Sequence, residues 1–121
     1  MKPTVKTLDE METQEFPWGS ITWLVSGRIG NSETMTFGRV VIRAGEGNPA
    51  HAHNTCDEIL HLLHGELEHG ADDEVFTLKP GDTITLPAGT AHWARSVGRE
   101  DAVMTVAYSS PERDMQTEGD D

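Results

Sequence analysis

The feature that most constrains the fold is a series of short segments rich in Val, Ile, Thr and aromatic residues, each bounded by clusters of Gly, Pro, Asn or Asp. Strand-forming segments with this close spacing are typical of antiparallel sandwiches and barrels. The predicted strands are residues 21–27, 34–43, 58–69, 74–78, 82–87, 92–97 and 102–109. The sequence therefore predicts an all-β protein, and no helix is needed to account for it.

Residues 58–69 (EILHLLHGELEH) contain enough Leu and Glu to suggest a helix. Gly65 interrupts this segment, and turn residues flank it on both sides. Because glycine is a poor helix former and a frequent turn residue, we expect two strands joined by a bend at Gly65.

The chain has 121 residues and no break in composition, which favours a single domain. We expect a mostly polar N-terminal arm at residues 1–18, a barrel at 19–110, and a polar, acidic, flexible tail at 111–121. The arm ends in Phe16, Pro17 and Trp18, and it could lie across the barrel or across a second copy of the chain. Small barrels often gain buried surface by self-association, so a homodimer is predicted.

Acidic residues outnumber basic ones by 21 to 9, which gives a formal charge of −12. This charge repels phosphate backbones and anionic lipids, so nucleic acid and membranes are not expected partners. Solubility is the simplest explanation of the charge, with adaptation to high salt as the alternative. Cys56 is the only cysteine, and we find no signal peptide and no long apolar run, so a cytoplasmic location is predicted.

Histidine and glutamate residues form a pattern suited to metal binding. His51 and His53 are two residues apart, so in a strand both imidazoles point to the same face. Glu58 follows after a short turn, and His92 begins a later strand that can complete the site. Three imidazoles and one carboxylate suit one divalent transition metal (Fe, Mn, Ni, Cu or Zn) better than Ca²⁺ or Mg²⁺. On a six-coordinate ion, such a set leaves two positions for water or substrate.

Two stretches resemble the paired motifs of the cupin superfamily. The first contains, in order and with cupin-like spacing, Gly45, His51, His53, Glu58 and Gly65; the second contains Gly81, Pro87, Gly89, His92 and Ser96. Cupins usually have Asn where this chain has Ser96, which puts a strand-end hydrogen bond in doubt but not the metal ligands. The resemblance implies a double-stranded β-helix, a jelly-roll barrel with the metal inside.

The resemblance to small single-domain cupins also implies a function. It favours a metal-dependent enzyme that acts on a small polar compound, such as a carboxylate, a sugar acid or a diketone, as a dioxygenase, isomerase or lyase. The alternative is a non-catalytic sensor or binding module. Cupin regulators usually carry a DNA-binding helix pair, which this sequence lacks. Cupin storage proteins usually have two barrels in tandem, and this chain has one.

Further histidines lie close to the predicted ligands. By alternation along a strand, His64 shares the face of Glu58 and is a candidate acid or base at the pocket mouth, although a turn-adjacent histidine is more often simply solvated. His61 points the other way, and His69 is expected to be exposed.

Three more side chains are candidates for contact with substrate. Cys56 lies in the turn before Glu58 and could reach the metal or the substrate, or have no catalytic role. Arg39 could turn inward to bind a substrate carboxylate, or outward toward the acidic surface. Tyr108 is a candidate for the pocket wall or the core. Trp93 is expected to face away from His92.

Overall fold

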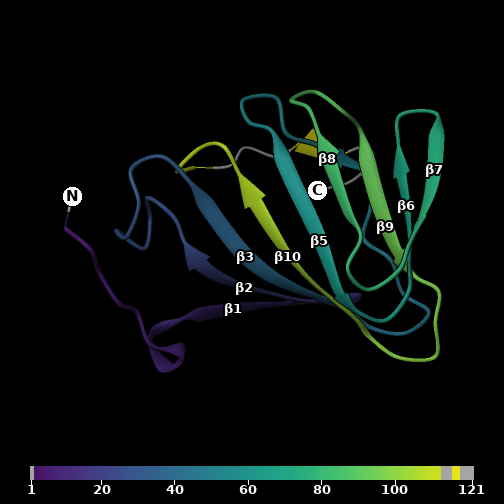
Figure 1. Ribbon diagram of the computed structural model, residues 1–121, viewed down its shortest axis with the longest axis horizontal. Coiled ribbons are helices and arrows are strands. Elements are labelled where there is room, and N and C mark those ends of the chain that lie inside the picture. Colours follow the sequence, from purple (N-terminus) through teal and green to yellow (C-terminus); the bar gives the residue numbers. More distant parts are fainter. Residues whose placement is uncertain (1, 113–115, 118–121) are drawn as a thin grey trace.

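The computed structural model describes residues 2–112 and 116–117. These residues form one short 3₁₀ helix, η1 (Leu8–Glu10), and antiparallel strands (Figure 1). The strands are β1 (Glu12–Phe16), β2 (Gly19–Val25), β3 (Thr36–Ile42), β4 (His51–Ala52), β5 (Glu58–His64), β6 (Leu67–Ala71), β7 (Glu74–Leu78), β8 (Thr83–Leu86), β9 (His92–Ser96), β10 (Ala102–Tyr108) and β11 (Gln116–Thr117). Within the described ranges, no helix is long and apolar enough to cross a membrane.

The strands form two sheets. One has the order β1-β2-β3-β10-β5-β8, and the other has the order β11-β4-β9-β6-β7. Figure 1 shows the two sheets as the two sides of the fold, with the connections between β5 and β6 and between β8 and β9 crossing from one side to the other. The predicted all-β fold is confirmed, and the two facing sheets form the expected jelly roll.

The core lies between the two sheets. Strands β3 and β10 alternate strictly between buried and less buried positions, as expected when one face of a sheet packs inward. The largest fully buried apolar side chains are Ile42, Leu62, Leu67 and Met104, each with an exposed fraction of 1% or less. Both sheets therefore contribute to one continuous core.

The bend predicted within residues 58–69 is confirmed, because β5 and β6 are separate strands on either side of Gly65. Gly65 has a φ of +87°, a conformation that non-glycine residues rarely adopt. Across the bend the chain passes from the first sheet to the second. The sheet that holds Glu58 is thereby joined directly to the sheet that holds His69.

The expectation of an N-terminal arm reaching to residue 18 is wrong for its second half. Residues 12–16 form the edge strand β1, which pairs with β2 from Glu12 opposite Trp23 to Phe16 opposite Gly19. The run of polar, exposed residues from Glu12 to Glu15 suits a strand at the edge of a sheet. The predicted tail at 111–121 lies largely outside the described residues, although Gln116 and Thr117 pair with β4.

Replacing Gly65 with Ala is expected to destabilise the fold by about 2–4 kcal/mol, measured by denaturant unfolding. A Cβ atom there would lie 2.7 Å from the backbone oxygen of Asp101, in addition to the cost of the positive φ. Gly45 is the matched control, since it has a φ of +83° but a Cβ atom there would meet no described residue within 4 Å. Gly45→Ala should cost only about 1 kcal/mol. Equal costs at the two positions would contradict the close approach at Gly65.

Candidate metal centre

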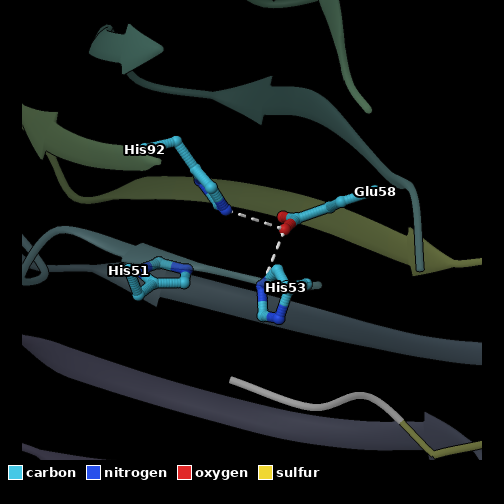
Figure 2. Close-up of side chains that lie close together, drawn as sticks. All are labelled: His51, His53, Glu58 and His92. Atoms are coloured by element: carbon cyan, nitrogen blue, oxygen red, sulfur yellow. Dashed lines mark ion pairs between the residues drawn. The ribbon is translucent and has the colours of Figure 1, made fainter. Parts of the chain in front are cut away.

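The predicted ligands come from both sheets and meet between them. His51 in β4 lies directly opposite His92 in β9, so both rings leave the same sheet side by side. Glu58 is the first residue of β5 in the other sheet, and His53 lies in the loop that follows β4. Figure 2 shows the carboxylate of Glu58 pointing toward the rings of His53 and His92, with the ring of His51 beside them.

The four side chains are close together and shielded from water. One ligand atom from each lies within 4.8 Å of the others. The Oε1 atom of Glu58 is 3.1 Å from Nε2 of His53 and 3.3 Å from Nε2 of His92. The exposed fractions are 8% for His51, 4% for Glu58, and 3% for both His53 and His92. A buried charged group of this kind requires a partner that compensates its lost hydration.

The arrangement fits a bound cation. Oε1 of Glu58 and Nε2 of His92 are buried, yet neither atom makes a hydrogen bond within the described residues. Two neighbouring ligands bonded to one metal at about 2.1 Å lie roughly 3.0–3.4 Å apart, which matches the two distances to Oε1. A transition metal ion held by His51, His53, Glu58 and His92 would supply the missing partner of both atoms.

Backbone groups orient two of the rings. The Nδ1–H group of His51 donates to the carbonyl oxygen of Pro49 at 2.9 Å, so the lone pair on Nε2 is left for a metal. The loop carrying His53 is held by the turn at residues 87–89. The backbone N–H of Gly89 donates to the carbonyl oxygen of His53 at 2.8 Å. This explains in physical terms why the two motif stretches occur together: the turn of the second positions a ligand of the first.

The structure also accounts for Ser96, the position at which the sequence departs from the cupin motif. Ser96 ends β9 and is fully buried, and its Oγ–H donates to the carbonyl oxygen of Glu100 at 3.2 Å. A serine therefore makes a strand-end hydrogen bond at the position where cupins usually have Asn. The position lies away from the metal ligands, as expected from the sequence.

The protonation states favour metal binding near neutral pH. Burial alone would raise the pKa of Glu58, but the adjacent rings of His53 and His92 outweigh it and lower the pKa to about 2. Burial, followed by repulsion from the neighbouring His92, lowers the pKa of His51 to about 4. At pH 7 the site thus presents an ionised carboxylate and a neutral His51 imidazole, which are the forms that bind metals.

A cavity of about 230 Å³ opens directly onto this cluster. His51, Glu58 and His92 form part of its wall, so a molecule in the cavity would lie against the metal ligands. Most of the remaining wall is apolar and includes Trp18, Ile21, Ile42, Leu60, Met104 and Val106. Phe16 and Trp18, whose rings stack at 4.8 Å, also line it, so the N-terminal hairpin supplies part of the site.

His69 also lines the cavity, and the expectation that it is exposed is wrong. It has an exposed fraction of 0%, and its ring stacks on that of His92 with centroids 5.4 Å apart and planes at 10°. Neither ring nitrogen makes a hydrogen bond to any part of the chain that the structure describes. Burial, followed by repulsion from His92, lowers the pKa of His69 to about 4. The alternation of Leu67 and His69 on the inner face of β6 is the signal that could have identified it.

The candidate role of His64 at the pocket mouth is not supported, and the alternative of a solvated histidine holds. The pairing of β5 with β10 shifts between Leu62 and His64, which breaks the alternation on which the prediction depended. His64 consequently turns outward, where its side chain is 56% exposed and its Nε2 lies 2.9 Å from Oε2 of Glu100. His61 points away from the cavity as expected, and its Nδ1 lies 2.7 Å from Oγ1 of Thr83.

Replacing His64 with Gln is expected to leave metal content and ligand binding unchanged within twofold. The side chain makes only an exposed ion pair, and such pairs contribute little to stability. Elemental analysis and a binding titration of the purified variant would test this. A loss of bound metal, or a large loss of affinity for the ligand, would show that His64 contributes to the site.

The three proposed substrate contacts have different outcomes. Arg39 is exposed on the outer face of β3, so the outward alternative holds. Cys56 is 3% exposed and packs in the apolar core, and it is not part of the cavity wall. Tyr108 lines the cavity, with its ring edge-on to His53 at 5.0 Å. Trp93 lies over Gly70, on the face of the sheet opposite His92, as predicted.

Comparison with known proteins agrees with this architecture. The sequence pattern of the cupin domain matches residues 38–108. The chain is 29% identical over 111 residues to the polyketide synthase CurC of Streptomyces cyaneus, covering 92% of this chain and 71% of that protein. It spans much less of other relatives, such as 39% of a germin-like protein of Arabidopsis thaliana.

Two solved structures show the same fold. KdgF from Halomonas sp. superposes with a TM-score of 0.74 at 23% identity, over 88% of this chain and 94% of KdgF. Oxalate decarboxylase from Lactobacillus farciminis superposes with a TM-score of 0.84 at 18% identity, over 91% of this chain and 34% of the decarboxylase.

A two-sheet barrel with three histidines and one glutamate buried between the sheets defines a class of metal-binding β-proteins. With the cupin pattern matched over residues 38–108, the chain belongs to the cupin family.

Proposed function

We propose that this cupin is a metal-dependent enzyme that transforms a small molecule by oxygenation, isomerisation or elimination. The observation that carries the proposal is that the cavity opens onto His51, Glu58 and His92, so that a bound molecule can reach a metal held there. A purely structural metal site would instead be closed on all sides by protein ligands.

The residues of the chain would hold one divalent transition metal through His51, His53, Glu58 and His92. The bound ion would supply Lewis acidity toward substrate oxygens, or, if it is redox-active, reactivity with O₂. The apolar wall around the cluster excludes water, which strengthens electrostatic interactions with a developing negative charge on the substrate. His51 is kept in one tautomer by Pro49, so the ligand set is fixed before substrate arrives.

The names of the relatives support different substrates. CurC is a polyketide synthase by name, which favours a carbonyl-rich polyketide, whereas oxalate decarboxylase acts on a dicarboxylate by name. The sequence resemblance to CurC extends over most of this chain, while the decarboxylase shares only the fold. We therefore place carbonyl compounds ahead of dicarboxylates.

An anaerobic reconstitution experiment tests the proposal. The purified chain would be loaded in turn with Fe²⁺, Mn²⁺, Ni²⁺, Cu²⁺ or Zn²⁺ and then mixed with carboxylates, sugar acids and diketones, with and without O₂. Oxygen consumption would support a dioxygenase, and product without oxygen consumption would support an isomerase or lyase. Ligand binding with no turnover under any of these conditions would overturn the enzymatic proposal in favour of a sensor or binding module.

A further inference from the structure

The wall of the cavity lacks cationic side chains. Of the described residues that line it, none is Lys or Arg. Arg43 comes near through the β1–β2 turn, but its Nη2 donates to the carbonyl oxygens of Phe16 and Pro17, and the residue is exposed. A bound metal would be the main positive charge available to a ligand, and Glu58 offsets part of it. A second carboxylate on the ligand would therefore be buried without a partner, which is costly.

The wall also offers few hydrogen bonds. Apart from the metal ligands and the indole N–H of Trp18, its polar side-chain groups are those of Asn48, His69 and Tyr108. The Oδ1 atom of Asn48 already accepts a hydrogen bond from the backbone N–H of Ala94 at 2.8 Å. Each sugar hydroxyl buried here without a partner would cost about 1–3 kcal/mol. The cavity is thus poorly suited to a polyhydroxylated ligand.

The size and chemistry of the wall favour a compact apolar ligand. The volume of about 230 Å³ is below the roughly 300–1,000 Å³ of pockets for drug-sized molecules. Aromatic and aliphatic side chains from both sheets and from the N-terminal hairpin cover most of the surface. A ligand with an apolar body gains about 25 cal/mol for each Å² of apolar surface removed from water.

His69 is the polar side chain best placed to contact such a ligand beside the metal. It is fully buried, it faces the cavity, and neither of its ring nitrogens has a hydrogen-bond partner among the described residues. It lies outside the group of four ligand atoms that converge within 4.8 Å. Since unsatisfied buried polar groups are rare in native proteins, a ligand in the cavity is the natural partner for this ring.

Together, these observations define a substrate class, which rests on the proposed metal-dependent function. We propose that the cavity takes an apolar compound with a single chelating pair of oxygens, such as a 1,3-diketone in its enolate form, and that His69 donates a hydrogen bond to one of those oxygens. The two oxygens would occupy the two positions that four protein ligands leave on a six-coordinate ion. The remainder of the molecule would pack against the apolar wall.

Titration calorimetry on the Mn²⁺-loaded protein tests the class directly. Manganese accepts six ligands, and measurement in the absence of O₂ prevents oxygen-dependent turnover. The probes are 1-phenyl-1,3-butanedione, malonate, which keeps the oxygen spacing but carries two charges, and glucuronate as a sugar acid. We expect the diketone to bind at least tenfold more tightly than either of the others. Equal or tighter binding of malonate or glucuronate would overturn the substrate class.

Variants at His69 test its contact with the ligand. His69→Phe keeps a ring against His92 but removes the hydrogen bond, so diketone affinity should fall roughly 3- to 10-fold while manganese content stays the same. His69→Asn, which restores a donor, should recover part of the loss. His61→Phe, on the outer face of β5, is the matched control and should bind the diketone as the parent does. Unchanged affinity in His69→Phe, or loss of manganese from it, would contradict the assigned role.

The outcomes separate this inference from the proposed function. If the chain takes up no metal, the proposed metal-dependent function is itself wrong. A chain that takes up metal and prefers malonate would keep the metal-dependent function and lose only the substrate class and the role of His69.

Discussion

Replacing His53 with Ala is expected to weaken metal binding by at least about 100-fold. Changes to groups that only orient a metal ligand already cost 10- to 100-fold in affinity, and removal of a ligand should cost more. His53 is buried and its Nε2 lies 3.1 Å from the Glu58 carboxylate, so its loss would leave a gap in the ligand set inside the protein. Competition with a chromophoric chelator, combined with elemental analysis, would measure the loss.

The control for this substitution is His61→Ala. His61 lies on β5 close in sequence to Glu58, but it points to the outer face, where it contacts Thr83. The control should bind metal with the affinity of the parent chain. Retention of one ion per chain by His53→Ala, with circular dichroism showing an intact fold, would mean that the ligands are assigned wrongly.

Metal binding is expected to raise the melting temperature by roughly 10–20 °C when free metal exceeds its dissociation constant a thousandfold. The ion binds a site that exists only in the folded chain, because its ligands come from both sheets and the intervening loop. At that excess the added free energy of unfolding is about 4 kcal/mol. Thermal scans with metal and with a chelator would show the difference.

Glu58→Gln is expected to remove nearly all of this stabilisation. Glutamine has almost the same shape but no negative charge to compensate the cation. Its melting temperatures with metal and with chelator should therefore nearly coincide. Glu100→Gln alters an exposed carboxylate that pairs with His64, and it should retain the full metal-dependent shift. A full shift in Glu58→Gln would show that the ion binds elsewhere.

Much of the fold could be predicted from the sequence because strands and turns have strong local signals. The segment at 102–109 is rich in Val, aromatic and small residues, and it forms strand β10 between β3 and β5, where a strand was predicted. Strand β1 was missed because its residues, Glu12 to Phe16, are mostly polar. An edge strand exposed in this way takes its stability from pairing with β2, which a local pattern does not reveal.

The cavity was harder to predict than the cluster of four ligands. The four ligands could be identified from the sequence because their spacing matches the cupin motifs. The structure brings His51, His53, Glu58 and His92 together as predicted. His64 and His69 depend instead on strand register. An irregularity near the end of β5 turns His64 out, and the new alternation that begins after Gly65 turns His69 in. A homodimer and a cytoplasmic location stay predictions.

The most direct test of the central claim is a crystal structure of the metal-loaded chain, with diffraction data collected on both sides of the absorption edge of the added metal. We predict one strong anomalous peak per chain, about 2.0–2.3 Å from Nε2 of His51, His53 and His92 and from a carboxylate oxygen of Glu58. The absence of a peak between these four side chains, or a peak held by other residues, would contradict the account.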